Sequence, residues 1–172
     1  MITVLRLGHR VGRDKRMTTH CALAARALGA DRILYSGDED SNVEENIDSV
    51  VDRWGGDFEI EYLRSWKKFL RDFNGKKVYL SMYGIPLEEC MEEVEEYEND
   101  VCIVVGGEKV SGEIYEYIDI QVAVTNQPHS EVAALGVFLH EFIEDKELDK
   151  KRDDAEIDVV PKGSGKEVQE EN

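Results

Sequence analysis

The sequence has few cysteines, and they do not occur in any pattern typical of a disulfide framework or a zinc site. Cys21, Cys90 and Cys102 are odd in number and widely spaced, without a Cys-x-x-Cys pair. Cys102 lies in an apolar run and is most simply a small buried hydrophobic residue. His9 and His20 stand eleven residues apart without clustered partners, so we predict no metal.

Long hydrophobic runs are also missing. No apolar run approaches the ~20 residues of a membrane span, and no charged-then-apolar signal segment opens the chain. We therefore expect a cytoplasmic protein with no membrane partner. The glycines form neither G-x-G-x-x-G nor G-x-x-x-x-G-K-[ST], so the specific patterns of dinucleotide and phosphate loops are absent.

Positive charge is scarce but concentrated. The chain carries 21 Lys and Arg against 38 Asp and Glu, a net charge of −17. Residues 1–32 and residues 62–77 each carry a net charge of +5, which leaves −27 for the remainder. Two basic segments that face the same way attract a polyanion, because local potential acts within a Debye length of ~8–10 Å. Alternatively, both segments are merely solvated faces.

The length of 172 residues fits one domain with a substantial core. Strand patterns alternate with helical patterns, which predicts an α/β fold with a mostly parallel sheet and helices on both faces. Strands are predicted at 2–7, 33–35, 58–62, 77–82, 101–105 and 118–124. Helices are predicted from Thr18 or Thr19 to Leu28, from Ser41 or Asn42 to Trp54, from Ser65 to Phe73, from Pro86 to Tyr97, and from His129 or Ser130 towards Glu144. We predict a single domain at 1–145 and an acidic, partly mobile C-terminal extension at 146–172.

The stretch from Ile103 to Phe142 contains two strand-to-loop junctions. The apolar run 101–105 breaks into Gly106-Gly107, and the run 118–124 breaks into a polar loop at Thr125–Ser130. Fully apolar strands are typical of parallel sheets, and ligands bind at the carboxyl ends of such strands. The two loops are therefore candidates for one pocket. The Gly-Gly pair lets backbone amides approach a ligand closely, although an ordinary turn would also use it.

Two blocks in this stretch and two before it carry a resemblance. LRLGHR…RDKRMTTH, YLSMYG, VVGGEKV and VTNQPHSEVAALGVFLHEF resemble the archaeal tRNA cytidine ribose 2′-O-methyltransferases of the knotted SPOUT class. The resemblance covers residues 1 to about 142. It implies a parallel α/β sheet whose C-terminal part forms a trefoil knot, and a homodimer with the last knot helix near the interface.

The resemblance also implies a reaction and a cofactor. The reaction is methylation of the ribose 2′-hydroxyl of a T-loop cytidine of tRNA, at position 56, by S-adenosylmethionine. The implied cofactor-binding residues are Leu80, Gly106, Gly107, Glu108, Lys109, Val110, Val124, Thr125, Asn126, Gln127, Pro128, His129, Ser130 and Glu131.

An arginine of the N-terminal motif activates the hydroxyl in relatives of this class. We predict Arg16, at the end of the basic loop, with Arg10 and Arg13 as alternatives or phosphate contacts. The Asn-x-x-Ala-x-x-Arg pattern of broader ribose-methylating relatives is not present. The predicted RNA-binding residues are Arg10, Arg13, Lys15, Lys67 and Lys68.

Two other interpretations remain open. A non-catalytic α/β knot module would bind S-adenosylmethionine or RNA without transferring a methyl group. A flavodoxin-like phosphate-binding or regulatory domain would explain the sheet but not the polar loop after residue 124.

Overall fold

The computed structural model describes residues 1–95, 100–106, 110–143, 152 and 154–170. Its main sheet contains β1 (Ile2–His9), β2 (Arg32–Gly37), β3 (Glu59–Tyr62), β4 (Lys76–Pro86), β5 (Val101–Gly106) and β6 (Ile120–Ala123). The helices are α1 (Lys15–Ala27), α2 (Ser41–Trp54), α3 (Trp66–Asp72), α4 (Leu87–Glu95), α5 (Glu131–Ile143) and the short 3₁₀ helix η1 (Gly112–Glu116). Two further strands, β7 (Ile157–Val159) and β8 (Val168–Glu170), form an antiparallel hairpin.

The six-stranded sheet has the order β3-β2-β1-β5-β4-β6, and every strand pair in it is parallel. The alternation of side chains along each strand divides the core between the two faces. In β5, Val101, Ile103 and Val105 join the cluster under α1, α2, α4 and α5, whereas Cys102 and Val104 join the cluster under α3 and η1. The predicted α/β class, with a parallel sheet and helices on both faces, is confirmed.

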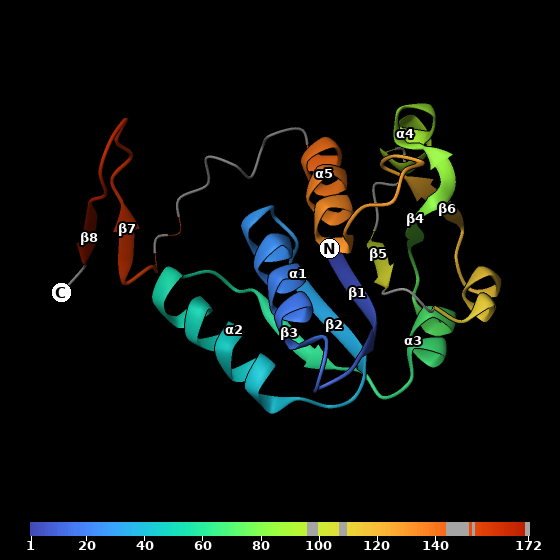
Figure 1. Ribbon diagram of the computed structural model, residues 1–172, viewed down its shortest axis with the longest axis horizontal. Helices are drawn as coiled ribbons and strands as arrows, with labels where there is room; N and C mark the ends of the chain where they lie inside the picture. Colours follow the sequence, from blue (N-terminus) through green and yellow to red (C-terminus); the bar gives the residue numbers. More distant parts are fainter. Residues whose placement is uncertain (96–99, 107–109, 144–151, 153, 171–172) are drawn as a thin grey trace.

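The chain crosses the sheet after its last strand. β6 lies at the edge of the sheet beyond β4, yet α5 returns to pack against α1, which covers the central strand (Figure 1). Asn126 fixes this return, because its side-chain amide donates to the carbonyl oxygens of Met82 (2.7 Å) and Gly84 (3.2 Å). The knot implied by the resemblance concerns this return and the segment between β5 and η1, whose residues 107–109 lie outside the described residues.

Two predicted element boundaries and one predicted helix cap are wrong. α1 begins at Lys15, not at Thr18 or Thr19: the Asp14 carbonyl accepts the Thr18 amide (2.9 Å), and the Thr18 hydroxyl bonds to His9 instead of capping a helix. Asp40, not Ser41 or Asn42, caps α2 by accepting the Asn42 amide (3.1 Å).

The third concerns β4 and α4. β4 was expected to end near Met82 and Pro86 to lie in the next helix, but β4 resumes pairing with β6 at Ile85 and Pro86 after an irregularity. α4 therefore begins at Leu87. Pro86 can end β4 because the interrupted ladder requires no amide donor at that position, and the helix therefore starts after it.

The C-terminal extension contacts the body of the protein at the turn after α2. Both carboxylate oxygens of Asp154 accept the Gly56 amide (2.9 Å), and Arg152 donates to the carbonyl oxygen of Arg26 (3.0 Å). Beyond this contact, the β7–β8 hairpin stands apart from the main sheet, on the far side of α2 (Figure 1). The extent of motion predicted for the extension stays a prediction.

All three cysteines are buried, which gives a simple test of the core. Burial raises the pKa of each thiol, to about 12 for Cys21 and Cys102. Because the thiolate is the reactive form, we expect negligible reaction with a disulfide reagent at pH 8 in the native state and complete reaction after denaturation. Spectrophotometric titration of thiols checks this, and rapid modification of any cysteine in native protein would contradict the packing described.

Within the described ranges, no helix is long and apolar enough to cross a membrane. Nor do three or more His, Cys, Asp or Glu side chains in those same ranges gather where they could hold a metal ion.

Candidate cofactor and RNA site

The carboxyl ends of the central strands bring the predicted loops to one edge of the sheet. Leu7 of β1 is in register with Gly106, the last residue of β5. A Cβ atom added to Gly106 would lie 2.2 Å from a methyl group of Val110 and 3.6 Å from the Cβ of Leu7. Glycine is therefore required here, because any side chain would displace Val110. The predicted residues Gly107, Glu108 and Lys109 lie outside the described residues.

The second predicted loop follows β6. Val124 is half-buried against the core, whereas residues 125–130 are exposed. Ser130 caps α5: its hydroxyl oxygen accepts the Ala133 amide (3.1 Å). His129 bonds through Nδ1 to the carbonyl oxygen of Ser130 (3.1 Å) and takes no part in capping. The exposed side chains at 125–130 are available for a ligand, apart from that of Asn126, which is bound to β4.

Leu80 lies below this loop. It is 7% exposed, belongs to the core and is in register with Val122 of β6. Of the cofactor residues implied by the resemblance, the structure thus brings Leu80, Gly106, Val110 and the 124–131 stretch to neighbouring strand ends. This arrangement combines an apolar floor with backbone and amide groups above it, which is suited to a nucleoside.

The basic loop leaves the carboxyl end of β1. The guanidinium of Arg10 makes two hydrogen bonds to Asp14, at 2.6 Å and 3.2 Å, and these hold the pKa of the Asp14 carboxyl below its usual range. Arg13, Lys15 and Arg16 are exposed. None of the three makes an ion pair with another described residue. Arg16 lies in the first turn of α1 and not in the loop that sequence reasoning assigned it.

Buried polar groups hold this loop in place. His9 is 1% exposed; its Nδ1 lies 2.7 Å from the Thr18 hydroxyl and its Nε2 lies 3.4 Å from a carboxylate oxygen of Asp40. Asp38 binds the basic loop through two hydrogen bonds. Its amide donates to the His9 carbonyl (2.8 Å), and its carboxylate accepts the Val11 amide (3.1 Å). The β2–α2 turn is therefore the support on which the basic loop rests.

Asp40 stays ionised in this buried setting. Burial, the largest single influence, raises the pKa of its carboxyl. Hydrogen bonds from the Asn42 side chain and amide, together with the nearby His9 ring and the charge of Lys15, outweigh burial and leave the pKa below its usual value. A fixed negative charge behind the basic loop helps to orient its cations.

Sequence reasoning did not find His9, Thr18 and Asp40 as a group. Their pattern is spread over two loops and a helix, and no short motif marks it. Arg6 and Arg26 are counted in the +5 charge of residues 1–32. The structure buries both, with Arg6 paired to Glu131 and Arg26 donating to the carbonyl oxygen of Gly55 (2.6 Å).

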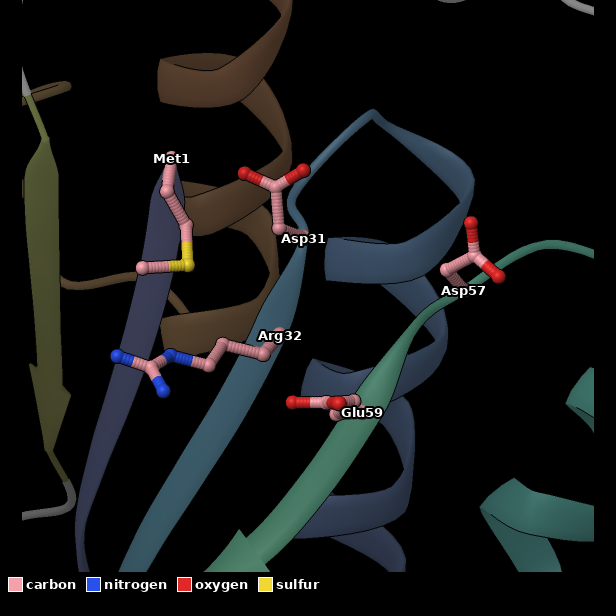
Figure 2. Close-up of a pocket in the computed structure, with 5 residues that line it drawn as sticks. All are labelled: Met1, Asp31, Arg32, Asp57 and Glu59. Atoms are coloured by element: carbon pink, nitrogen blue, oxygen red, sulfur yellow. The ribbon is translucent and has the colours of Figure 1, made fainter.

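A hollow of about 400 Å³ lies at the other edge of the sheet. It is lined by Met1, Asp31, Arg32, Asp57 and Glu59, at the amino ends of β1, β2 and β3. Figure 2 shows that the three carboxylates point in different directions and do not converge on one point. This hollow is separate from the strand ends that carry the predicted loops.

Comparisons with known proteins agree with this geometry. A family model described as tRNA ribose 2′-O-methyltransferase, aTrm56, matches residues 54–169. The tRNA (cytidine(56)-2′-O)-methyltransferase of Archaeoglobus fulgidus is 53% identical over 167 residues, covering 97% of each chain. The enzyme of the same name from Pyrococcus horikoshii is 51% identical over 173 residues, covering 99% of this chain and 85% of the relative.

Solved structures show the same fold at low sequence identity. The TrmH/SpoU tRNA modifying enzyme of A. aeolicus has a TM-score of 0.61 at 18% identity, over 88% of this chain and 80% of the other. The SpoU methyltransferase AviRb from Streptomyces viridochromogenes, in complex with AdoMet, has a TM-score of 0.57 at 12% identity, over 85% of this chain and 57% of the other. The family match covers more than half of the chain, and the chain belongs to the aTrm56 family of tRNA ribose 2′-O-methyltransferases.

Proposed function

We propose that this protein transfers a methyl group from S-adenosylmethionine to the ribose 2′-oxygen of cytidine 56 in tRNA. Support comes from family membership and from relatives of about 50% identity that carry this name and are covered over most of their length. The observation in the structure that carries the proposal is the meeting of Gly106, the 125–130 loop and the basic loop at one edge of the sheet.

The residues at this edge fit the cofactor. Gly106 accommodates the Val110 side chain, which any larger residue there would displace, and Leu80 with Val124 offers apolar contact for a purine. The exposed amides and hydroxyls of 125–130 offer hydrogen bonds to a ribose or an amino-acid group. When bound, S-adenosylmethionine supplies an electrophilic methyl group on a positively charged sulfur. Its position relative to the 2′-oxygen is then decisive, because orientation accounts for much of the acceleration in a two-reactant transfer.

The 2′-hydroxyl needs help to react, since it is a weak nucleophile while it holds its proton. Arg16 and Arg13 are both exposed on the side of the basic loop, where a guanidinium stabilises negative charge developing on the oxygen. Arg10 is less suited to this role because its guanidinium is already bound to Asp14. We therefore keep Arg16 as the proposed catalytic residue, Arg13 as its alternative, and Arg10 as a residue that shapes the loop.

Transfer of labelled methyl from S-adenosylmethionine to unmodified tRNA tests the proposal. Nucleoside analysis and mapping should give 2′-O-methylcytidine at position 56. A methylated base, or a ribose at another position, would contradict the proposed target. Cofactor binding without transfer to folded tRNA would favour the non-catalytic binding module, and no preference for S-adenosylmethionine over FMN would favour the flavodoxin-like interpretation.

Lys67 and Lys68 are proposed to contact tRNA, and the structure separates their contributions. Lys67 donates to Glu113 (2.6 Å) and lies 5.6 Å from the centre of the Trp66 ring, whereas Lys68 is exposed and has no ion pair with another described residue. We expect Lys68→Glu to weaken tRNA binding about tenfold at low salt, because it removes one phosphate contact and adds repulsion. Lys67→Glu should have a smaller effect. Affinity for S-adenosylmethionine should not change in either variant.

Filter binding of tRNA at two salt concentrations measures these effects. Arg53→Glu is the matched control, because it makes the same charge change at the end of α2, on the opposite face of the sheet. Equal loss of tRNA affinity in the Lys68 and Arg53 variants would show that total charge matters and that α3 makes no specific contact.

We also propose that the active unit is a homodimer formed near α5. Val137 of α5 is 43% exposed, and Tyr83 and Ile85 of the irregular part of β4 are 78% and 47% exposed. We expect these side chains to form one apolar contact surface between the two subunits, because contiguous exposed apolar patches mark contact sites. Light scattering coupled to gel filtration tests this: we expect twice the chain mass of 19.6 kDa, and Val137→Glu should reduce it to that of one chain.

A further inference from the structure

Arg6 is a buried charged residue within the apolar strand β1. Its side chain is 1% exposed, and both neighbours, Leu5 and Leu7, belong to the core. Its partner is Glu131, the first residue of α5, whose side chain is 10% exposed; Nη2 lies 2.9 Å and Nε 3.3 Å from the same carboxylate oxygen, Oε1. The pair joins residues that are 125 positions apart in the sequence.

The geometry of this pair is not the one that stability alone would favour. Arginine and a carboxylate bind most strongly through two parallel hydrogen bonds to two oxygens. Here Nη1 of Arg6 and Oε2 of Glu131 are both buried and make no hydrogen bond with any described residue. Burying an unpaired donor and acceptor costs stability, and a buried ion pair often adds none that apolar residues would not supply. The pair therefore needs another explanation.

The position of the Arg6–Glu131 pair supplies an explanation. Arg6 is in register with Val105 of β5, one residue before the glycine at which β5 ends, and on its other side with Tyr35 of β2. Glu131 directly follows the exposed 125–130 loop. The basic loop that follows β1 begins at Arg10, four residues after Arg6. The pair is the direct side-chain link between the strand that carries the basic loop and the helix that carries the second cofactor loop.

We infer that Arg6 is a positioning residue, which acts through Glu131 to set the distance between the cofactor loop and the arginines of the basic loop. The inference rests on the proposed function, because it assigns these two loops to the methyl donor and to the ribose. An ion pair fixes a direction as well as a contact, whereas packed apolar side chains leave α5 able to slide. A displacement of about 1 Å is enough to lower the rate of a transfer reaction about 100-fold.

Replacing the whole pair separates positioning from stability. In the variant Arg6→Met with Glu131→Met, apolar side chains of similar length fill the same space, so the melting temperature should stay near that of the wild type. We expect the Kd for S-adenosylmethionine, measured by calorimetry, to rise about tenfold and kcat on tRNA to fall about 100-fold. The KM for tRNA should not change, because the exposed cations remain. The control variant Lys162→Met with Glu167→Met removes an ion pair of the β7–β8 hairpin and should match the wild type in all of these quantities.

Wild-type values of Kd and kcat in a double variant of unchanged melting temperature would overturn the inference. Should the double variant fail to fold, Arg6→Lys provides the same test, since it leaves Glu131 in place, keeps the positive charge and removes the fixed geometry of the guanidinium. A cofactor Kd raised about threefold or more in folded Arg6→Lys would support positioning through the pair, and an unaltered Kd and kcat would refute it. Failure of the wild-type protein to methylate tRNA would instead refute the proposed function, and with it the basis of this inference.

Discussion

Replacing Arg16 by alanine is expected to lower turnover about 100-fold to 10,000-fold at saturating tRNA and cofactor, the range typical of losing a group that assists proton removal or stabilises developing charge. Arg16 is exposed in the first turn of α1, two residues before Thr18, whose hydroxyl is hydrogen-bonded with His9. Because the helix fixes its backbone, loss of the guanidinium should change chemistry more than folding. Single-turnover methylation assays measure the effect.

Arg13→Ala and Arg53→Ala provide the comparison for Arg16→Ala. Arg13 is exposed in the same loop, and Arg53 lies at the end of α2. We expect Arg13→Ala mainly to raise the KM for tRNA and Arg53→Ala to leave the kinetics unchanged. Near-normal turnover of Arg16→Ala together with a large fall in kcat for Arg13→Ala would transfer the catalytic role to Arg13.

The second large effect is expected at Gly37, in the turn that supports the basic loop. Its φ angle is +119°, which side-chain-bearing residues rarely adopt, and an added Cβ atom would lie 2.2 Å from the carbonyl oxygen of His9 and 2.7 Å from its amide nitrogen. Gly37→Ala should therefore lower the free energy of unfolding by about 1–3 kcal/mol from backbone strain alone. Displacement of His9 should add to this loss and should also raise the KM for tRNA, because the basic loop rests on this turn.

Gly12→Ala is the matched control, since Gly12 lies in the basic loop itself, has no positive φ angle, and has no heavy atom within 4 Å of an added Cβ. Its free energy of unfolding should stay within about 1 kcal/mol of the wild type or rise slightly. Urea unfolding followed by circular dichroism compares the two. Equal stability of both variants would contradict the close contact between Gly37 and His9.

The sequence was sufficient to predict most of the sheet. The run 101–105 is apolar at every position because β5 is paired on both sides and covered on both faces, and such strands are easily recognised. The range of α2 and the start of α5 close to Ser130 were predicted for equally local reasons. Each of these signals depends on residues a few positions apart.

The errors arose where distant residues decide the local structure. Thr18 has the chemistry of a helix cap, but His9 takes its hydroxyl, and α1 begins three residues earlier. Pro86 suits a first helical turn, but β6 pairs with it as the end of β4. The burial of Arg6 was not predicted, because its ion partner lies 125 residues away and no local pattern indicates a buried arginine.

The candidate site was predicted in outline for a different reason. The loops after residues 105 and 124 were predicted as candidate binding loops from their strands, and their ligand was proposed from the family resemblance. The roles of individual arginines did not follow from either source. The structure distinguishes the roles of these arginines by their exposure and partners. The guanidinium of Arg10 is hydrogen-bonded to Asp14, whereas Arg13 and Arg16 are exposed to solvent.

The strand order also determines how the chain assembles during synthesis. β1, β2 and β3 are neighbours in the sheet and are complete by residue 62, but the other side of β1 pairs with β5, which begins at Val101. For the time needed to synthesise about 40 residues, at ~5–20 residues per second, β1 is an open hydrophobic edge. Such an edge invites pairing with other chains. Ribosome-bound fragments ending between residues 70 and 95 should therefore aggregate more readily on release than fragments that include β5.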